Sequence, residues 1–109
     1  MIRQMEVDEL KKILDKDSKA ILIDVREEGE FKDVHAPRAQ LLPLSEFDPT
    51  DVSDQMHIPK EQTIYVICKS GGRSMRAAQL LEEAGYKDLV NILGGTTAWV
   101  QSGFATNNG

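Results

Sequence analysis

Three short apolar runs most constrain what this chain can fold into. They cover residues 20–25, 63–67 and 89–93, and branched side chains dominate them. A continuous apolar run of this length is typical of a strand buried on both faces of a sheet. The segment over residues 39–44 is predicted to form a further short strand, which Pro43 stops. Because segments with helical spacing lie between these runs, the sequence predicts an α/β fold with a central, mainly parallel sheet and helices on both faces.

The helices follow from apolar spacing and from capping residues. Asp8 is expected to cap a helix over residues 9–16, where apolar side chains recur on one face. The clearest helix covers residues 74–84, whose apolar stripe is followed by a glycine that can end the helix. A last short helix is predicted over residues 96–101, and one helical turn near residues 52–56 in an otherwise irregular segment.

The size and charge of the chain limit its class. Its 109 residues fit one domain, residues 1–109, with an ordered core over about 3–103 and a tail, 104–109, that is expected to fray. A net charge of -5 argues against a nucleic-acid partner, because such proteins usually present a basic surface. No apolar run approaches the roughly 20 residues that cross a bilayer, so no membrane partner is expected.

The remaining composition sets expectations about compartment and metals. The first residues are charged throughout and lack the apolar core of a secretion signal, so the cytoplasm is the expected location. A single cysteine cannot form an internal disulfide. His35 and His57 have no cysteine or histidine neighbours at metal-ligand spacing, and we expect no metal.

That single cysteine, Cys68, stands at an informative place. It directly follows the predicted strand 63–67 and opens the stretch Cys-Lys-Ser-Gly-Gly-Arg-Ser, just before the clearest helix. In open parallel sheets, ligands bind beyond the carboxyl ends of the strands. The position of Cys68 therefore indicates a functional thiol before its chemistry is considered.

The loop after Cys68 can stabilise a thiolate, which is the reactive form of cysteine. Unpaired amides at a helix N-terminus favour an anion, and adjacent glycines let the backbone turn its amides inward. Lysine and arginine add positive charge at the rim, and the serines offer hydroxyl groups, although the second serine is also suited to capping the helix. A buried, inert thiol is the alternative for any lone cysteine, but the combination of features favours a nucleophile whose sulfur is expected to be ionised and open to attack. The predicted catalytic residue is Cys68, and the predicted substrate-binding residues are Lys69, Ser70, Gly71, Gly72, Arg73 and Ser74.

Four segments in order resemble the rhodanese family. They are ILIDVREEGEFKDVHA, LLPL, VICKSGGRSMRAAQLLEEAGY and VNILGGTTAW, and together they span nearly the whole chain. The resemblance implies a single rhodanese-like domain that acts as a sulfurtransferase without a cofactor. In that family the loop cysteine takes a sulfane sulfur from a donor such as thiosulfate, becomes a persulfide, and passes the sulfur to cyanide or a thiol. Cys68 matches the persulfide-carrying cysteine, and Arg73 matches the basic residue that closes the loop.

The implied partners are a small anionic sulfur donor and a cyanide or thiol acceptor, with a protein acceptor also open. Because the chain has one cysteine, it cannot discharge its own persulfide as an internal disulfide, so the sulfur must leave to an outside acceptor. The sequence departs from the family where glycines are usual: Val34 and Arg38 stand there. A glycine needed for a positive φ is costly to replace, which puts the shape of this segment in question. Ala105 stands where a proline is usual and bears only on the tail.

Several other residues are assigned structural roles. Asp24 is expected to satisfy backbone donors at the end of its strand, with Arg26 paired to an acidic neighbour such as Glu28 or Glu30. His35 is expected to make a structural hydrogen bond. His57 is predicted to lie at the surface, and Trp99 is predicted to be buried. Gly94 and Gly95 are both assigned structural roles.

Two other functions compete with sulfur transfer. Cysteine-based phosphatases use a cysteine and an arginine separated by five residues and a histidine before the cysteine; here four residues separate Cys68 from Arg73, and Ile67 precedes the cysteine. A shorter loop gives a smaller cradle, which suits a sulfur atom better than a phosphate. A persulfide carrier that serves a partner enzyme is the other alternative, and the sequence does not separate it from an enzyme.

Overall fold

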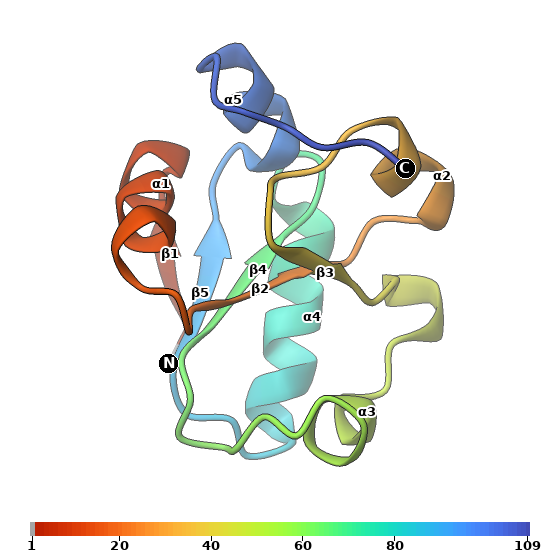
Figure 1. Ribbon diagram of the computed structural model, residues 1–109. Coiled ribbons are helices and arrows are strands. Elements are labelled where there is room, and N and C mark those ends of the chain that lie inside the picture. The colour runs from red at the N-terminus through yellow and green to blue at the C-terminus, as the bar shows by residue number, and fades with distance from the viewer. Residues whose placement is uncertain (1) are drawn as a thin grey trace.

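The computed structural model describes residues 2–109 and contains one five-stranded sheet. Its order is β1-β5-β4-β2-β3, and every pair of neighbouring strands is parallel (Figure 1). The predicted α/β fold with a parallel sheet is therefore confirmed. The strands are β1 (Ile2–Met5), β2 (Ile21–Asp24), β3 (Ala39–Leu41), β4 (Ile64–Ile67) and β5 (Leu89–Ile92).

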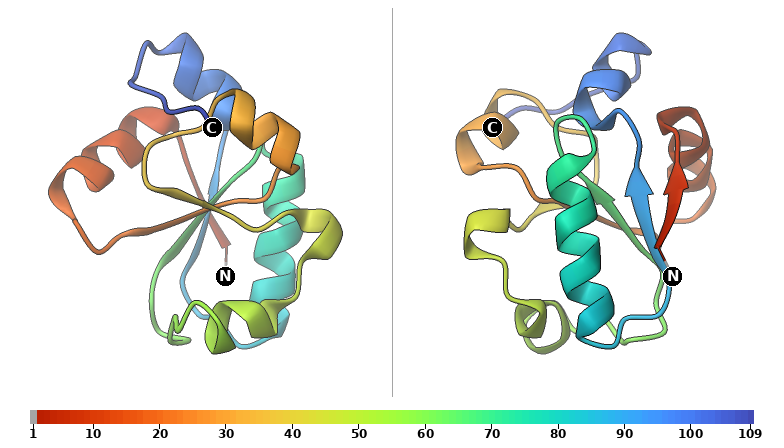
Figure 2. Two further views of the ribbon diagram at one scale, coloured as in Figure 1. Left: turned by 45° about the vertical axis from the view of Figure 1, so that its right-hand side comes forward. Right: turned by 180° about the vertical axis from the view of Figure 1, so that it is seen from behind.

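Helices cover both faces of the sheet. The α-helices are α1 (Val7–Lys16), α2 (Glu28–Asp33), α3 (Pro49–Asp54), α4 (Gly72–Glu83) and α5 (Gly95–Gln101), and a short 3-10 helix spans Leu44–Glu46. One core cluster joins α1 and α5 to the sheet through residues such as Leu10 and Trp99, and the other joins α3 and α4 through residues such as Val52 and Leu81. Figure 2 shows α4 on the face opposite α1.

Successive residues of the central strands enter opposite clusters. Leu22 packs in the α1 side of the core and Ile23 in the α4 side, as the alternation of side chains along a strand requires. Because both faces are covered, β4 and β5 are buried throughout, and their sequences are apolar except for Asn91 in β5. The apolar runs that predicted the sheet thus follow from its position between two helical layers.

The register of the strands brings the functional segments to one edge. Asp24 at the end of β2 pairs with Ile67 at the end of β4, so the residues after each strand emerge side by side. β5 lies on the other side of β4, with Asn91 opposite Val66. The chain after β2, β4 and β5 therefore supplies the loops around Cys68.

Two local features at the N-terminal end differ from the sequence analysis. The strand β1 was not predicted, because Arg3 and Gln4 are exposed and β1 lies at the sheet edge, where no apolar run is needed. Asp8 is not a cap: α1 begins at Val7 with Glu6 as its N-cap, and Asp8 lies in its first turn. A carboxylate there is still favourable because it faces the positive end of the helix dipole.

The last residues fold back toward α2. The backbones of His35 and Asn107 exchange two hydrogen bonds, each of 2.9 Å, and the Gly109 amide donates to the Lys32 carbonyl oxygen at 2.8 Å. The indole of Trp99 donates to the Ala105 carbonyl oxygen at 2.9 Å. The C-terminus accordingly lies beside α2 (Figure 1).

The two positions where the family has glycines behave differently. Val34 has a φ of -165°, an extended conformation open to any residue. Arg38 has a φ of 71°, the left-handed region that glycine tolerates best. Its guanidinium donates to the Leu14 and Ala20 carbonyl oxygens, at 2.7 and 3.1 Å. These hydrogen bonds, one of them to the last turn of α1, offset part of the backbone strain.

None of the helices in residues 2–109 is long and apolar enough to cross a membrane.

Candidate active site

Cys68 is the first residue after β4, and its side chain is enclosed. The residue is 1% exposed, so the expectation of an open sulfur was wrong. The side chain belongs to the core cluster on the α4 side of the sheet, and α5 begins directly against the backbone of the cysteine loop. The Thr96 amide donates to the Cys68 carbonyl oxygen at 2.8 Å, and the Thr97 amide donates to the Lys69 carbonyl oxygen at 3.1 Å.

The backbone around the sulfur nevertheless points inward, as the sequence predicts. The Gly71 amide donates to Cys68 Sγ at 3.0 Å, and Ser74 Oγ lies 3.3 Å from the same sulfur. Burial raises the pKa of the Cys68 thiol, but hydrogen bonds from the Ser74 hydroxyl and from the amides of Ser74, Gly71 and Ser70 lower it by more. The net result is a pKa below the ordinary cysteine value, which favours the thiolate.

The two loop glycines are not equivalent. Gly71 has a φ of 119° and is the N-cap of α4, so the inward turn of its amide depends on a conformation that other residues rarely adopt. Gly72 is the first residue of α4, has no positive φ, and has open space where a Cβ would lie. The expectation that both glycines shape the turn was right for Gly71 and wrong for Gly72.

Ser74 lies inside α4 and does not cap it. Its buried hydroxyl carries one proton and lies within hydrogen-bond distance of three acceptors, Cys68 Sγ, Asn91 Oδ1 and the Gly71 carbonyl oxygen, so donation to the sulfur competes with donation to the two oxygens. The Asn91 amide in turn donates to Gln4 Oε1 at 3.3 Å. A chain of polar side chains therefore runs from the edge strand β1 through β5 to the sulfur of Cys68, and it fixes where the Ser74 hydroxyl lies.

Arg73 is not a free cation at the rim of the loop. Its guanidinium makes two hydrogen bonds to the Glu30 carboxylate, at 2.7 and 2.9 Å. The side-chain hydrogen bonds from Arg73 are the main reason that the pKa of Glu30 falls from 4.5 to about 2. The Glu30 carboxylate therefore competes with any substrate anion for the Arg73 guanidinium. In this structure the ion pair joins α2 to the start of α4.

Arg26 was assigned the wrong acidic partner. It pairs with the buried Asp24, with an Arg26 Nη2 to Asp24 Oδ2 distance of 2.8 Å, and not with Glu28 or Glu30. Asp24 Oδ1 also accepts the Arg26 amide at 3.0 Å, so its predicted role as an acceptor for backbone donors is confirmed. The guanidinium further donates to the Val34 carbonyl oxygen at 2.7 Å.

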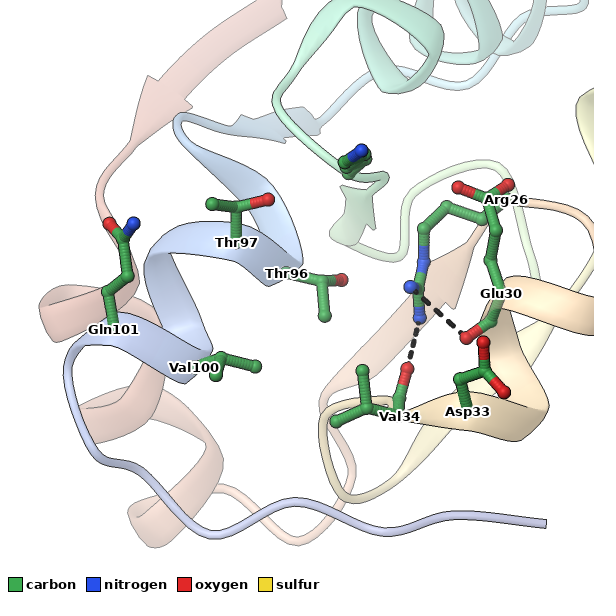
Figure 3. Close-up of a pocket in the computed structure, with 9 residues that line it drawn as sticks. Arg26, Glu30, Asp33, Val34, Thr96, Thr97, Val100 and Gln101 are labelled. Carbon is green, nitrogen blue, oxygen red and sulfur yellow. Dashed lines mark hydrogen bonds between the residues drawn. The ribbon is translucent and has the colours of Figure 1, made fainter.

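A cavity of about 430 Å³ lies beside the loop, between α5 and the segment around α2. Figure 3 shows Arg26, Glu30 and Asp33 on one side of it and Thr96, Thr97 and Val100 on the other. Lys69 is the one predicted loop residue that lines it, whereas Cys68 does not. A molecule in this cavity would therefore contact charged and apolar side chains of the wall, and not the sulfur itself. Ser70 is exposed and contributes its amide toward the sulfur.

The residues assigned structural roles are placed as follows. His35 is buried, and its Nδ1 lies 2.7 Å from the Phe31 carbonyl oxygen, which confirms the structural hydrogen bond. His57 is exposed and Trp99 is 1% exposed, both as predicted. Gly95 packs so closely on the cysteine loop that a Cβ there would lie 2.3 Å from the Cys68 carbonyl oxygen, so its structural role is also confirmed.

Four residues of this site were not predicted as functional: Arg26, Glu30, Asn91 and Thr96. Two carried a usable signal. Arg26 follows the end of β2 closely, much as Cys68 follows β4, and Asn91 is the one polar residue in β5. Glu30 and Thr96 carried none, because their importance depends on contacts between distant segments.

The fold and this geometry together define a parallel α/β domain that holds one low-pKa thiol in a loop of inward-facing amides. The family described as Rhodanese-like domain matches residues 6–102. The chain therefore belongs to the rhodanese-like domain family.

Similar proteins agree with this assignment. A sulfurtransferase from Allochromatium vinosum is 30% identical over 94% of this chain and 92% of its own length. The putative sulfur carrier protein YrkF from Bacillus subtilis is 30% identical over 90% of this chain and 51% of its own length. The adenylyltransferase and sulfurtransferase uba4 from Ogataea parapolymorpha is 38% identical over 72% of this chain, which spans only 19% of that longer protein. A crystal structure of a rhodanese-like domain protein from Staphylococcus aureus superposes with a TM-score of 0.74 at 31% identity, over 89% of this chain and 90% of that one.

Proposed function

We propose that this protein is a sulfurtransferase in which Cys68 carries a sulfane sulfur as a persulfide. The observation that carries the proposal is the pair of contacts at the sulfur: the Gly71 amide at 3.0 Å and the Ser74 hydroxyl at 3.3 Å. Donation to the sulfur, which the Gly71 amide makes and the Ser74 hydroxyl can make, favours a thiolate, and a thiolate is the form that attacks sulfur. The similarity to a protein named sulfurtransferase over nearly the whole chain supports the same reaction.

The proposed reaction has two steps. The Cys68 thiolate attacks the outer sulfur of an anionic donor such as thiosulfate, forming the S–S bond of a persulfide while sulfite leaves with the electrons of the broken bond. A thiophilic acceptor, cyanide or a thiol, then takes the terminal sulfur, and Cys68 returns to its thiolate. The loop amides hold the anionic sulfur in both states, and Lys69 attracts the donor to the cavity.

The enclosure of Cys68 adds a requirement to this reaction. Since the residue is 1% exposed and does not line the cavity, the donor reaches the sulfur only after a local movement of the loop. Lys69 and Ser70, the two residues that follow Cys68, are exposed. This part of the chain is therefore where we expect the movement.

Intact mass spectrometry after thiosulfate treatment tests the proposal. The wild type should gain the mass of one sulfur atom, and Cys68→Ser should gain none. The added sulfur should disappear when cyanide is supplied. If the wild type stays unmodified by thiosulfate and by other sulfane donors, the proposal is wrong.

A persulfide carrier is the second candidate, and the enclosure of Cys68 favours it. A persulfide sealed from solvent is protected from acceptors that are free in solution. Its terminal sulfur can be transferred when a partner protein opens the loop. The name of the Bacillus subtilis relative, putative sulfur carrier protein, agrees with this reading. Stoichiometric loading without turnover would favour the carrier, and rapid conversion of thiosulfate and cyanide would favour the enzyme.

A further inference from the structure

The hydroxyl of Thr96 is a buried polar group without a partner. Thr96 is 2% exposed, and among the buried side-chain nitrogen and oxygen atoms of residues 2–109 its Oγ1 alone makes no hydrogen bond. Buried hydroxyls are nearly always hydrogen-bonded, because a buried hydroxyl without a hydrogen-bond partner costs free energy. An unpaired hydroxyl at a cavity wall therefore suggests that a ligand supplies the missing partner.

Thr96 is also held rigidly relative to the sulfur site. Its amide donates to the Cys68 carbonyl oxygen at 2.8 Å, and the preceding Gly95 is in contact with the Cys68 and Lys69 peptides. Figure 3 shows the Thr96 side chain extending from α5 into the cavity toward Arg26. The hydroxyl thus has a fixed place between the cavity and the loop that carries the nucleophile.

The arginines near this cavity are already engaged. Arg26 is bound by Asp24 and by main-chain carbonyl oxygens, and Arg73 is bound by Glu30. The ammonium of Lys69, in contrast, has no hydrogen-bond or ion-pair partner among residues 2–109. Lys69 and the sheltered Thr96 hydroxyl are consequently the cavity groups best placed to bind the oxygens of an incoming anion.

We propose that the Thr96 hydroxyl donates a hydrogen bond to a sulfonate oxygen of the sulfur donor, and so makes the site selective for donors of the thiosulfate or thiosulfonate class. This inference rests on the proposed function. During loading, the Cys68 sulfur bonds to the outer sulfur, and the sulfonate group leaves as sulfite (or as an organic sulfinate) with the electron pair of the broken S–S bond. Negative charge on its oxygens grows in this step, so a hydroxyl fixed against them stabilises the transition state more than the bound donor.

The test compares two donors on hydroxyl-free variants. Thr96→Val keeps the shape of the side chain and removes its hydroxyl, and Thr96→Ser keeps the hydroxyl. Single-turnover loading of Cys68 is followed by intact mass spectrometry, once with thiosulfate and once with inorganic polysulfide, which has no oxygens. Discharge of preloaded protein by cyanide is measured separately. Thr106→Val, in the exposed tail, is the control for a threonine remote from the cavity.

We expect Thr96→Val to load from thiosulfate roughly 10- to 100-fold more slowly, the loss typical of one hydrogen bond to a charged group. Loading from polysulfide and discharge by cyanide should stay within about threefold of the wild type. Thr96→Ser should recover most of the thiosulfate rate, and the melting temperature of Thr96→Val should not fall. The assignment of Thr96 would be overturned if Thr96→Val loaded from thiosulfate as fast as the wild type does. It would also be overturned if the variant lost the same factor in rate with thiosulfate and with polysulfide. If Thr96→Val does not fold, Thr96→Ala must show the same donor selectivity. A wild type that accepts sulfur from neither donor would instead refute the proposed function itself.

Discussion

Adding one methyl group at Gly95 should destabilise the protein and displace the cysteine loop, whereas the same addition at Gly72 should stabilise it. Gly95 has a φ of 54°, and a Cβ there would lie 2.3 Å from the Cys68 carbonyl oxygen and 2.6 Å from the Lys69 carbonyl oxygen. Both atoms belong to the backbone, so neither can rotate away as the end of a side chain could. Gly72 has open space at its Cβ position and lies in the first turn of α4.

The two magnitudes follow from these environments. A left-handed conformation costs a residue with a Cβ about 1–2 kcal/mol, and overpacking a filled interior costs about 1–3 kcal/mol, so Gly95→Ala should lose roughly 2–5 kcal/mol of unfolding free energy. Gly72→Ala should gain about 0.4–1 kcal/mol, since alanine restricts the unfolded chain and suits a helix. In a domain of this size each kcal/mol shifts the melting temperature by roughly 4–8 °C.

Urea unfolding of the wild type and both variants measures these differences. We also expect Gly95→Ala to take up sulfur from thiosulfate more slowly than the wild type even at a temperature where it remains folded, because the Cys68–Lys69 peptide must move to admit the methyl group. A Gly95→Ala variant as stable as the wild type, with normal loading, would refute the close packing of α5 on the cysteine loop.

Three further predictions concern charges and strain. Ser74→Ala should raise the pKa of Cys68, because the Ser74 hydroxyl lowers it in the wild type, and the pH profile of Cys68 alkylation should move to higher pH; an unmoved profile would count against the hydroxyl's role. Because the pKa of Glu30 falls from 4.5 to about 2 on folding, the stability of the wild type should decline as the pH drops from about 4.5 toward 2. In thermal melts, the stability of Glu30→Gln should decline less over the same pH range. Parallel declines of the two proteins would argue against the pair of Glu30 with Arg73. Arg38→Ala and Arg38→Gly both lose the guanidinium, but only alanine retains the strain of a φ of 71°, so the glycine variant should be more stable by roughly 1–2 kcal/mol in urea; the reverse order would contradict that strain.

The parts of the fold that could be predicted are those with a local cause. β2, β4 and β5 are buried on both faces, and such burial leaves a mainly apolar run that can be found in the sequence, although Asp24 ends β2 and Asn91 lies within β5. The edge strand β1 leaves no such run, since Arg3 and Gln4 are exposed. The position of the tail depends on backbone pairing between His35 and Asn107, which no local sequence pattern predicts.

The same distinction holds for the candidate site. The inward amides near Cys68 follow from a strand, a glycine and a helix that are consecutive in the chain, and the sequence predicts them. The partner of Arg73 is Glu30, 43 positions away, and Cys68 is buried in a core cluster that includes Ile23 and Val25, which are also remote in sequence. Contacts of that kind reversed two expectations, the free arginine and the open sulfur.

The most direct test of the account is an ultraviolet titration of the Cys68 thiolate. The chain has one cysteine, so subtracting the titration of Cys68→Ser leaves the signal of this thiol alone. The hydrogen bonds from Gly71 and Ser74 predict a midpoint below the value of roughly 8.5 that is ordinary for a free cysteine. A midpoint at or above that value would show that burial outweighs those hydrogen bonds and would contradict the account.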